Sequence, residues 1–467
     1  MNPDPASDIP GEDEIYFKGT RLEFQENKLD SFSPMILVIA LMTLGAQMFG
    51  YMEAELLNTY IDHVLNRDPI FIAIMVSSSA IMGLIFLFVF GIFSDNTRSR
   101  FGRRRPYLLF GGLVAGISMM FFAVSNNYWI CFIIDVVLIG IASNSFYAAQ
   151  RVLVPDLVEL KYRGRVNGIL SIMSVIGLIL PVGLTLLANE FFTIPNPDPM
   201  ETGSILTQQG HVVLLVIGGS FMAACGVIGF AFLKDSVPAS KLPPRKTFQE
   251  EIQATFNWEE LRKQKDFFKL IIANTIYMSG VNAVLSYLFN FIFSLGAETN
   301  ELIVMLLIAA PVLIITMVML GFLTDRIGRK QIIAPTILLS CVGFILVPFV
   351  VGDGKMNVVG FGFVLSLILI GIIGVLIPIN TWSQDLLPDE KRGQFFGIFN
   401  IVNTVSQVIG SMSAGLVATL LKDVVANPYA WIFAIVPIFF IISIPIFASV
   451  KETLEDAATA RDENQPD

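Results

Sequence analysis

Twelve apolar stretches, each close to 20 residues long and almost free of charge, dominate this sequence. An α-helix rises ~1.5 Å per residue, so about 20 apolar residues cross the ~30 Å core of a bilayer. Barrel strands would instead alternate over about 10 residues. The sequence therefore predicts an all-α membrane protein with twelve transmembrane helices, near residues 34–60, 71–93, 106–125, 128–154, 166–188, 211–233, 267–293, 302–324, 332–351, 357–382, 394–421 and 428–449.

The composition agrees with this prediction. Of the 467 residues, 54% are hydrophobic and 15% charged, whereas a soluble protein carries about 25% charged residues. Cys131, Cys225 and Cys341 all fall inside predicted helices, where we expect buried thiols rather than disulfides. The first 30 residues are polar and acidic, so we expect no cleavable signal peptide.

Motifs of enzymatic chemistry are missing from the sequence. It has no G-x-x-x-x-G-K-[ST] loop, no HExxH and no Cys/His cluster, so we expect no ATPase, no other enzyme, no metal site and no cofactor. The net charge of −9 does not indicate a basic partner, because 14 of the 39 acidic residues lie within 1–30 and 451–467. We expect no nucleic-acid partner.

The basic residues predict the orientation, because Lys and Arg concentrate on the cytoplasmic side of a membrane. With both termini inside, the cytoplasmic loops and tails hold 26 Lys and Arg, and the outer loops hold three. We therefore expect a multi-pass protein of the plasma or inner membrane with cytoplasmic termini.

Two sequence motifs occur twice at nearly the same separation. "GIFSD" at 91–95 resembles "GFLTD" at 321–325, and each precedes a basic loop. "VPDLVELKYRGRVNGI" at 154–169 resembles "SQDLLPDEKRGQFFGI" at 383–398. This repeat predicts a cytoplasmic tail (1–33), a six-helix bundle (34–233), a cytoplasmic linker (234–266), a second six-helix bundle (267–450) and a cytoplasmic tail (451–467).

The loop motif G-x-x-[ST]-D followed by G-R-[RK] resembles the signature of the major facilitator superfamily. The longer "SDNTRSRFGRRRPYL" and the ending "NSFYAAQRVLVPDL" resemble the sucrose–proton symporters and the wider glycoside–pentoside–hexuronide:cation symporters. The resemblance implies two pseudo-symmetric six-helix bundles and proton-coupled sugar uptake. It departs at one place: the aspartate that sucrose carriers keep in helix 4 would fall at Gly140, five residues after Asp135.

The repeated motifs provide candidate gating residues. An aspartate at the end of helix 2 can pair with an arginine or cap a neighbouring helix, and such ion pairs close a cytoplasmic gate. The alternative is that the basic loops serve topology alone. The second repeated pairs, which are Asp156 with Arg163 and Asp385 with Arg392, could bond between bundles or cap helices. The gating candidates are Gly91, Asp95, Arg103, Arg104, Asp156, Arg163, Gly321, Asp325, Arg329, Asp385 and Arg392.

Ionisable residues inside a membrane are costly and are functional candidates by default. Away from helix ends the sequence has four: Glu53, Glu55, Asp135 and Arg151. The two glutamates lie ~200° apart around the helix axis. Glu55 shares a polar stripe with Gln47, Tyr51, Asn58 and Asp62, so we expect it to face a water-filled cavity, whereas Glu53 has apolar neighbours. Glu53, Glu55 and Asp135 are the candidate proton-coupling residues, and the alternative for the glutamates is contact with water at the outer interface.

Candidate substrate-binding residues are polar side chains at helical spacing. The planar guanidinium of Arg151 can donate paired hydrogen bonds to sugar hydroxyls, although it could also reach the cytoplasmic interface. Neutral amides and aromatic rings suit a polyol, although any one of them could instead pack helices together. The candidates are Tyr51, Asn144, Tyr147, Arg151, Asn274, Tyr277, Asn282, Asn380, Trp382, Asn400, Asn403 and Gln407.

These patterns predict a monomeric secondary transporter that moves a sugar or glycoside, such as a disaccharide, together with protons by alternating access. The resemblance also favours protons over sodium, because a sodium site of the melibiose-carrier type takes acidic ligands from helix 2, and here helix 2 has no acidic residue between Phe71 and Phe93. The alternatives are a carrier or exporter of another small molecule, either lipid-like or drug-like, and a membrane sensor that does not transport. The expected contacts are the sugar or glycoside, protons and membrane lipid.

Overall fold

The computed structural model describes residues 34–159, 162–197, 203–233, 264–297, 299–351, 357–386 and 392–452. Only the backbone is described for residues 299, 306, 321, 325, 380–381, 384–385 and 392–397. Within these ranges, twelve helical segments are long and apolar enough to cross a membrane. The predicted all-α membrane fold is confirmed, since every predicted stretch overlaps one of these segments. The predicted N-terminal tail, and nearly all of the linker and of the C-terminal tail, lie outside the described residues.

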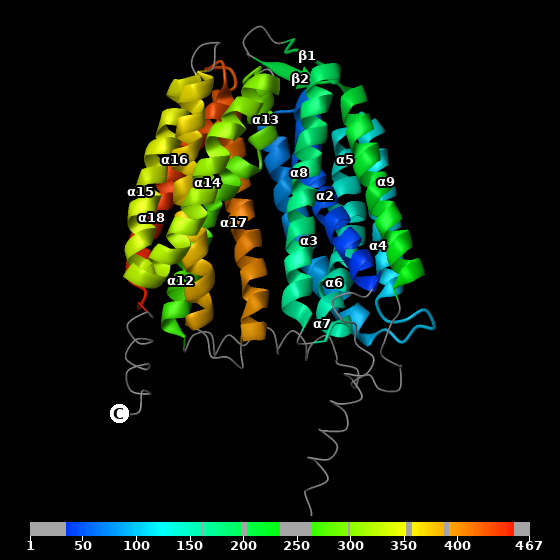
Figure 1. Cartoon of the computed structure of the whole chain (residues 1–467). Coiled ribbons are helices and arrows are strands. Elements are labelled where there is room, and N and C mark those ends of the chain that lie inside the picture. The colour runs from blue at the N-terminus through cyan, green and yellow to red at the C-terminus, as the bar shows by residue number, and fades with distance from the viewer. Residues whose placement is uncertain are drawn as a thin grey trace, which may run out of the picture.

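The helices form two bundles that stand side by side (Figure 1). The first bundle contains α2 (Pro34–His63), α3 (Pro69–Asn96), α4 (Arg105–Val124), α5 (Tyr128–Ile133), the π-helical turn η1 (Ile134–Ile139), α6 (Gly140–Arg151), α7 (Leu153–Leu157), α8 (Arg163–Phe192) and α9 (Gln208–Phe232). The segments α5, η1, α6 and α7 together make the fourth membrane crossing.

The second bundle contains α12 (Lys265–Leu285), α13 (Leu288–Ser294), α14 (Thr299–Ile327), α15 (Arg329–Val351), α16 (Val358–Asp385), α17 (Arg392–Leu421) and α18 (Pro428–Ala448). The seventh crossing is broken into α12 and α13 at Ser286 and Tyr287. Both bundles are therefore built from six crossings.

The two bundles pack their helices in the same order. In the first, α2 contacts α8 and α9, α4 contacts α9 and α6, and α3 contacts α6. In the second, α12 contacts α17 and α18, α15 contacts α18 and α16, and α14 contacts α16. Each contact recurs six crossings later, which is the pseudo-symmetry that the sequence repeat predicts.

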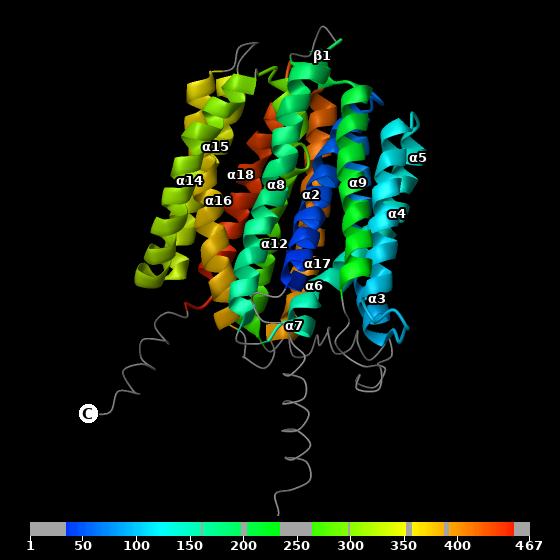
Figure 2. The same ribbon diagram turned by 45° about the vertical axis from the view of Figure 1, so that its right-hand side comes forward.

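The bundles meet along a seam. On one side α3 packs against α17, and on the other α8 contacts α14, again as related pairs. Figure 2 shows α8 and α14 on the same side of the molecule. A two-stranded antiparallel hairpin, β1 (Thr193–Pro195) and β2 (Ser204–Leu206), joins α8 to α9. It lies at the end opposite α7 (Figure 1), and its strands are too short for an alternating pattern to predict them. We call the end with α7 and the arginine-rich loop 97–104 the basic end. The opposite end, with β1 and β2, is the hairpin end.

Small residues bring α4 and α9 into backbone contact. A Cβ on Gly112 would overlap the backbone of Gly226, and a Cβ on Gly116 would overlap the carbonyl oxygen of Gly219. Glycines allow such close helix packing in membranes, where van der Waals contact supplies much of the association energy. The pair α4 and α9 is therefore a tightly packed unit of the first bundle.

The three cysteines, Cys131, Cys225 and Cys341, are buried free thiols.

Candidate functional site

A cavity of about 830 Å³ extends from the basic end to a point past the middle of α2, and we call it the central cavity. Its walls come from α2, α6, α7 and α8 of the first bundle. Polar groups line it from end to end: Thr43, Gln47, Tyr51, Tyr147, Gln150, Arg151, Arg163 and Asn167. These are mostly amides and hydroxyls, with two guanidinium groups toward the basic end.

Arg151 and Tyr147 lie one helical turn apart on α6, which puts both on the cavity wall. The Arg151 side chain is exposed, whereas Tyr147 is half-buried and donates its hydroxyl to the carbonyl oxygen of Ala46 at 3.3 Å. Gln150 donates from Nε2 to Thr43 Oγ1 at 3.0 Å. These bonds tie α6 to α2 and leave the guanidinium of Arg151 at the cavity surface. Asn144, one turn before, instead donates to the carbonyl oxygen of Gly140 at 2.9 Å.

Two carboxyl groups from different helices interact inside the first bundle. Glu53 of α2 and Asp135 of η1 interact electrostatically, and Asp135 also accepts a hydrogen bond from the Ser79 hydroxyl on α3. Asp135 is 3% exposed, and its Oδ1 has no hydrogen-bond partner among the described residues. Tyr147 lines the cavity and interacts electrostatically with both Glu53 and Arg151, so it connects the carboxyl pair with the cavity wall.

The π-helical turn explains how Asp135 reaches this position. Asp135 occupies the first turn of η1, where the backbone widens from i→i+4 to i→i+5 bonding. Such single-turn bulges are frequent at functional sites. The sequence predicted that Asp135 cannot share a face with Arg151, and accordingly it does not line the cavity but meets Glu53 behind it.

Glu55 does not line this cavity, contrary to the expectation from its polar stripe. It is 5% exposed and accepts a hydrogen bond from the backbone N–H of Phe289 in the second bundle. Asn58, on the same stripe, donates to the carbonyl oxygen of Ser286 at 2.9 Å. The stripe faces the seam because the bundles touch at this depth. The broken seventh crossing supplies the backbone groups that it binds.

The second-bundle candidates occupy different surroundings. Tyr277 and Trp382 are both fully buried. Tyr277 stacks on Phe440 with ring centroids 4.3 Å apart, and Trp382 donates from Nε1 to the carbonyl oxygen of Lys451 at 2.9 Å. Both therefore pack the second bundle rather than line the cavity.

The amide candidates of the second bundle lie on α12, α16 and α17. Asn274 is buried, and its Oδ1 has no hydrogen-bond partner among the described residues. Asn282 donates to Ser406 Oγ at 3.4 Å. Asn403 is exposed, Asn400 and Gln407 are half-buried, and the Asn380 side chain lies outside the described residues.

The first loop motif forms an ion-pair cluster at the basic end. Arg104 is 6% exposed and donates to Asp95 Oδ1 at 2.6 Å, Asp156 Oδ2 at 3.1 Å and Ser94 Oγ at 2.7 Å. Arg103 also donates to Asp156 Oδ2, at 2.6 Å. The cluster joins the end of α3, the start of α4 and α7 inside one bundle. No second-bundle side chain takes part in the contacts described for it.

The second repeated pair is arranged differently from the expected Asp156–Arg163 pair. Asp156 binds Arg103 and Arg104, whereas Arg163 donates to the carbonyl oxygens of Pro155 and Val158 at 2.7 and 3.2 Å. Arg163 therefore bonds carbonyl oxygens at the end of α7, rather than pairing with Asp156. A Cβ on Gly91 would meet nothing within 4 Å, so close packing does not explain that glycine.

The second copy of the loop motif is only partly described. Arg329 is 8% exposed, and the backbone N–H of Lys330 donates to Glu452 at 2.9 Å. Only the backbone is described at Gly321, Asp325, Asp385 and Arg392.

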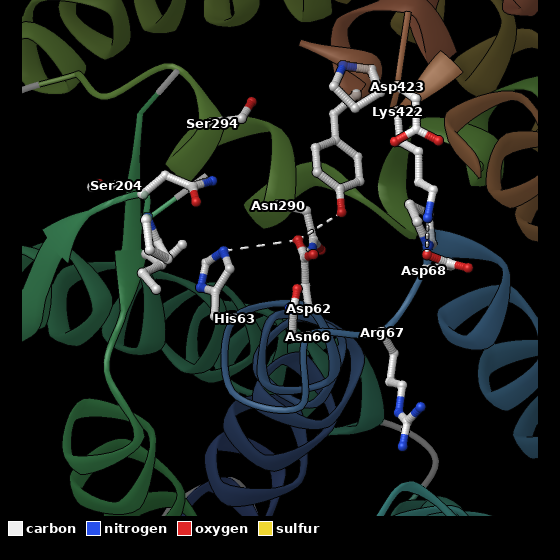
Figure 3. A pocket seen from close by; sticks show the side chains of 16 residues that line it. Asp62, His63, Asn66, Arg67, Asp68, Ser204, Asn290, Ser294, Lys422 and Asp423 are labelled. Atoms are coloured by element: carbon white, nitrogen blue, oxygen red, sulfur yellow. Dashed lines mark hydrogen bonds and ion pairs between the residues drawn. The ribbon is translucent and has the colours of Figure 1, made fainter. Parts of the chain in front are cut away.

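At the hairpin end, side-chain bonds join the two bundles (Figure 3). Asp62 Oδ2 of α2 accepts from Asn290 Nδ2 at 2.7 Å and from the Tyr429 hydroxyl at 2.6 Å. Lys422 pairs with Asp68, which precedes α3. These residues line a polar pocket of about 690 Å³. We call Asp62, Asn290, Tyr429, Asp68 and Lys422 the hairpin-end latch.

Further bonds reinforce this closure between α3 and the second bundle. Ser77 and Ser411 hydroxyls lie 3.0 Å apart, and the Tyr287 hydroxyl donates to the carbonyl oxygen of Pro69 at 2.7 Å. Sequence reasoning missed most of these residues. Asp62 was a member of the polar stripe, but polar residues at helix ends are ordinary and do not reveal their partners.

Comparisons with known proteins agree with this architecture. The nucleoside transporter NupG in a mutant form shares 15% identity with a TM-score of 0.67, over 88% of this chain and 98% of that one. A bacterial homolog of the human lysosomal transporter Spinster, inward-facing and occupied, shares 13% identity with a TM-score of 0.66, over 89% and 95%. The peptide transporter POT in complex with alafosfalin shares 14% identity with a TM-score of 0.67, over 92% and 98%.

At such low identities these structures establish a shared fold and nothing about the substrate. No curated protein matches the sequence. The sequence does match the Major Facilitator Superfamily over residues 35–411, and again over residues 302–465. Together with the paired six-helix bundles, this match shows that the chain is a membrane transporter of the major facilitator superfamily.

Proposed function

We propose that this protein is a proton-coupled symporter of a sugar or glycoside, working as a monomer in the plasma or inner membrane. The basic end faces the cytoplasm, because 26 Lys and Arg fall on that side in the predicted topology and three on the other. In this orientation the latched hairpin end is extracellular, and the cavity is open inward. Alternating access would then exchange the latch for a closure at the basic end.

The chemistry of the cavity supports a polyol substrate. Its polar lining consists of amides, hydroxyls and guanidinium groups, which together can donate to and accept from sugar hydroxyls. Tyr51 and Tyr147 add aromatic faces on which a pyranose ring can stack. A nucleoside, the cargo named for the structural neighbour NupG, is itself a glycoside of a base, so the same groups could bind it.

The observation that carries proton coupling is the carboxyl pair of Glu53 and Asp135 behind Tyr147. Two carboxyl groups that repel each other electrostatically resist joint ionisation, so one of them readily holds a proton. Tyr147 and Arg151 connect this pair to the cavity wall. Binding a polyol at Arg151 would change the electrostatic environment of the pair, and this links substrate to proton.

Transport by the purified protein in liposomes tests the proposal. Labelled mono- and disaccharides, glycosides and nucleosides are offered with an inward proton gradient and without one. We expect at least one to accumulate only with the gradient, and its addition should alkalinise the outer medium. If no compound moves under either condition, the substrate assignment is wrong. Movement in the opposite direction to protons would identify an exporter, and ligand binding without counterflow would identify a sensor.

A further inference from the structure

A second, apolar cavity lies on the seam between the bundles, toward the hairpin end. It has a volume of about 250 Å³ and is walled by α8 of the first bundle and by α13, α14, α16 and α18 of the second. Aromatic and aliphatic side chains make most of its surface, including Leu186, Phe289, Leu302, Phe361 and Phe433. We call this space the seam pocket.

The seam pocket adjoins the central cavity at one residue. Tyr51 lines both spaces, and its ring packs edge-on against Phe289 with centroids 5.7 Å apart. Tyr51 therefore separates the central cavity from the seam pocket. One molecule could place a hydrogen-bonding group in the central cavity and an apolar group in the seam pocket, on the two sides of this side chain.

A buried polar group in the seam pocket indicates a ligand. Thr185 of α8 lines the pocket and is 5% exposed, yet its Oγ1 has no hydrogen-bond partner among the described residues. Buried hydroxyls normally find a partner, and a threonine in a helix commonly bonds the carbonyl four residues earlier. A largely apolar lining with a buried hydroxyl that lacks a partner suits an apolar group that carries a polar substituent.

The size of the pocket limits the occupant. An engineered protein cavity of about 150 Å³ lined by Leu, Ile and Phe binds benzene, so about 250 Å³ admits a substituted ring or a short alkyl group. We propose that the seam pocket is an aglycone subsite, which receives the aryl or short alkyl group of a glycoside whose sugar lies in the central cavity. This inference rests on the proposed function and narrows the substrate class to glycosides with an apolar aglycone.

Matched pairs of methyl and phenyl glycosides test the subsite in liposomes. Glucoside, galactoside and xyloside pairs compete for counterflow, and half-saturation is compared within the pair that moves. We expect the phenyl compound to bind about tenfold or more tightly than the methyl one, since a buried phenyl group gains that much by leaving water. Equal half-saturation within the pair would overturn the subsite while leaving the transport function intact. Failure of every glycoside to move would instead contradict the proposed function.

Two neighbouring residues of α8 provide a variant and its control. Leu186 lines the seam pocket, whereas Leu187 is 61% exposed on the outer surface of the bundle. Leu186→Trp should abolish the phenyl preference, measured as the ratio of half-saturation between the methyl and the phenyl glycoside. Leu187→Trp should leave that ratio unchanged. If Leu186→Trp keeps the preference, the subsite is wrong.

The Thr185 hydroxyl gives a second measurement that does not depend on filling the pocket. Thr185→Val should weaken a 4-hydroxyphenyl glycoside about fivefold and leave the phenyl glycoside unchanged. Equal effects on both would overturn the role of the hydroxyl. Lipid bound to the purified protein is measured in parallel. If Leu186→Trp displaces a lipid without changing glycoside preference, the pocket is a lipid site and the proposal fails.

Discussion

At the scale of single residues, the two glutamates of α2 have different surroundings although they lie two positions apart. Glu53 couples to Asp135 within one bundle, whereas Glu55 bonds to the backbone of Phe289 in the other. The sequence could name both as membrane carboxyl groups, because such residues are rare in spans. It could not pair Glu53 with Asp135, because that contact depends on how two helices pack.

Neutralising the carboxyl pair should uncouple transport from protons. We expect Glu53→Gln and Asp135→Asn each to abolish accumulation driven by a pH gradient and to retain exchange of labelled for unlabelled substrate. Glu190→Gln, at an exposed carboxyl near the hairpin end of α8, is the control and should behave as the wild type. Gradient-driven accumulation that survives in both pair variants would remove the pair from the mechanism.

The guanidinium of Arg151 should contribute to substrate affinity more than to fold. Its side chain is exposed at the cavity wall, so little packing is lost on truncation. Arg151→Ala should raise the half-saturation constant by about 10–100-fold, since hydrogen bonds to charged groups contribute ~1.5–3 kcal/mol. Arg151→Lys should recover only part, because an ammonium lacks the planar fork. The exposed Arg165 offers a control, and Arg165→Ala should leave half-saturation unchanged.

At the scale of helices, hydropathy predicted the crossings well and their irregularities poorly. The predicted 71–93 and 428–449 lie close to Pro69–Asn96 and Pro428–Ala448, because desolvation of the backbone enforces helix throughout the bilayer. The π turn of η1 and the break at Ser286 escaped prediction. Both are local changes of hydrogen bonding that tertiary contacts stabilise, and they leave the apolar run unbroken.

The glycine contact between α4 and α9 should be essential to the first bundle. Gly116→Leu would place a side chain against the carbonyl oxygen of Gly219 and force the helices apart. We expect a severe loss of monodisperse protein in detergent and of thermal stability. Gly183→Leu in α8 is the matched control, because a Cβ there meets nothing within 4 Å. Equal losses in the two variants would show that close packing is not the cause.

At the scale of the whole molecule, the sequence repeat predicted two similar bundles but not which end is closed. Closure is decided by contacts between bundles, such as Asp62 with Tyr429 and Asp68 with Lys422. Each is a pair of ordinary polar residues some 350 positions apart in the chain. The central cavity likewise depends on that choice, so its lining could be named only as candidates.

Weakening the hairpin-end latch should shift the molecule toward the opposite opening. Asp62→Asn combined with Tyr429→Phe removes the charge and the donor of one bond between the bundles. Spin labels at Arg67→Cys and Val424→Cys, in exposed positions of the two bundles, should report a larger share of long distances. The native thiols are buried and should not interfere. An unchanged distance distribution would mean that the latch does not set the equilibrium.

The backbone contact of α4 with α9 has a consequence for how the carrier deforms. Neither helix contains an internal proline, and their glycines hold the two backbones in direct contact. This part of the first bundle should therefore move as a rigid block. Bending is left to helices that carry prolines within them, among which α8 with Pro181 and α14 with Pro311 flank the seam. The helices that bend during the transport cycle would then also be walls of the seam pocket. The same helices would therefore set both the size of the aglycone that fits and the rate of transport.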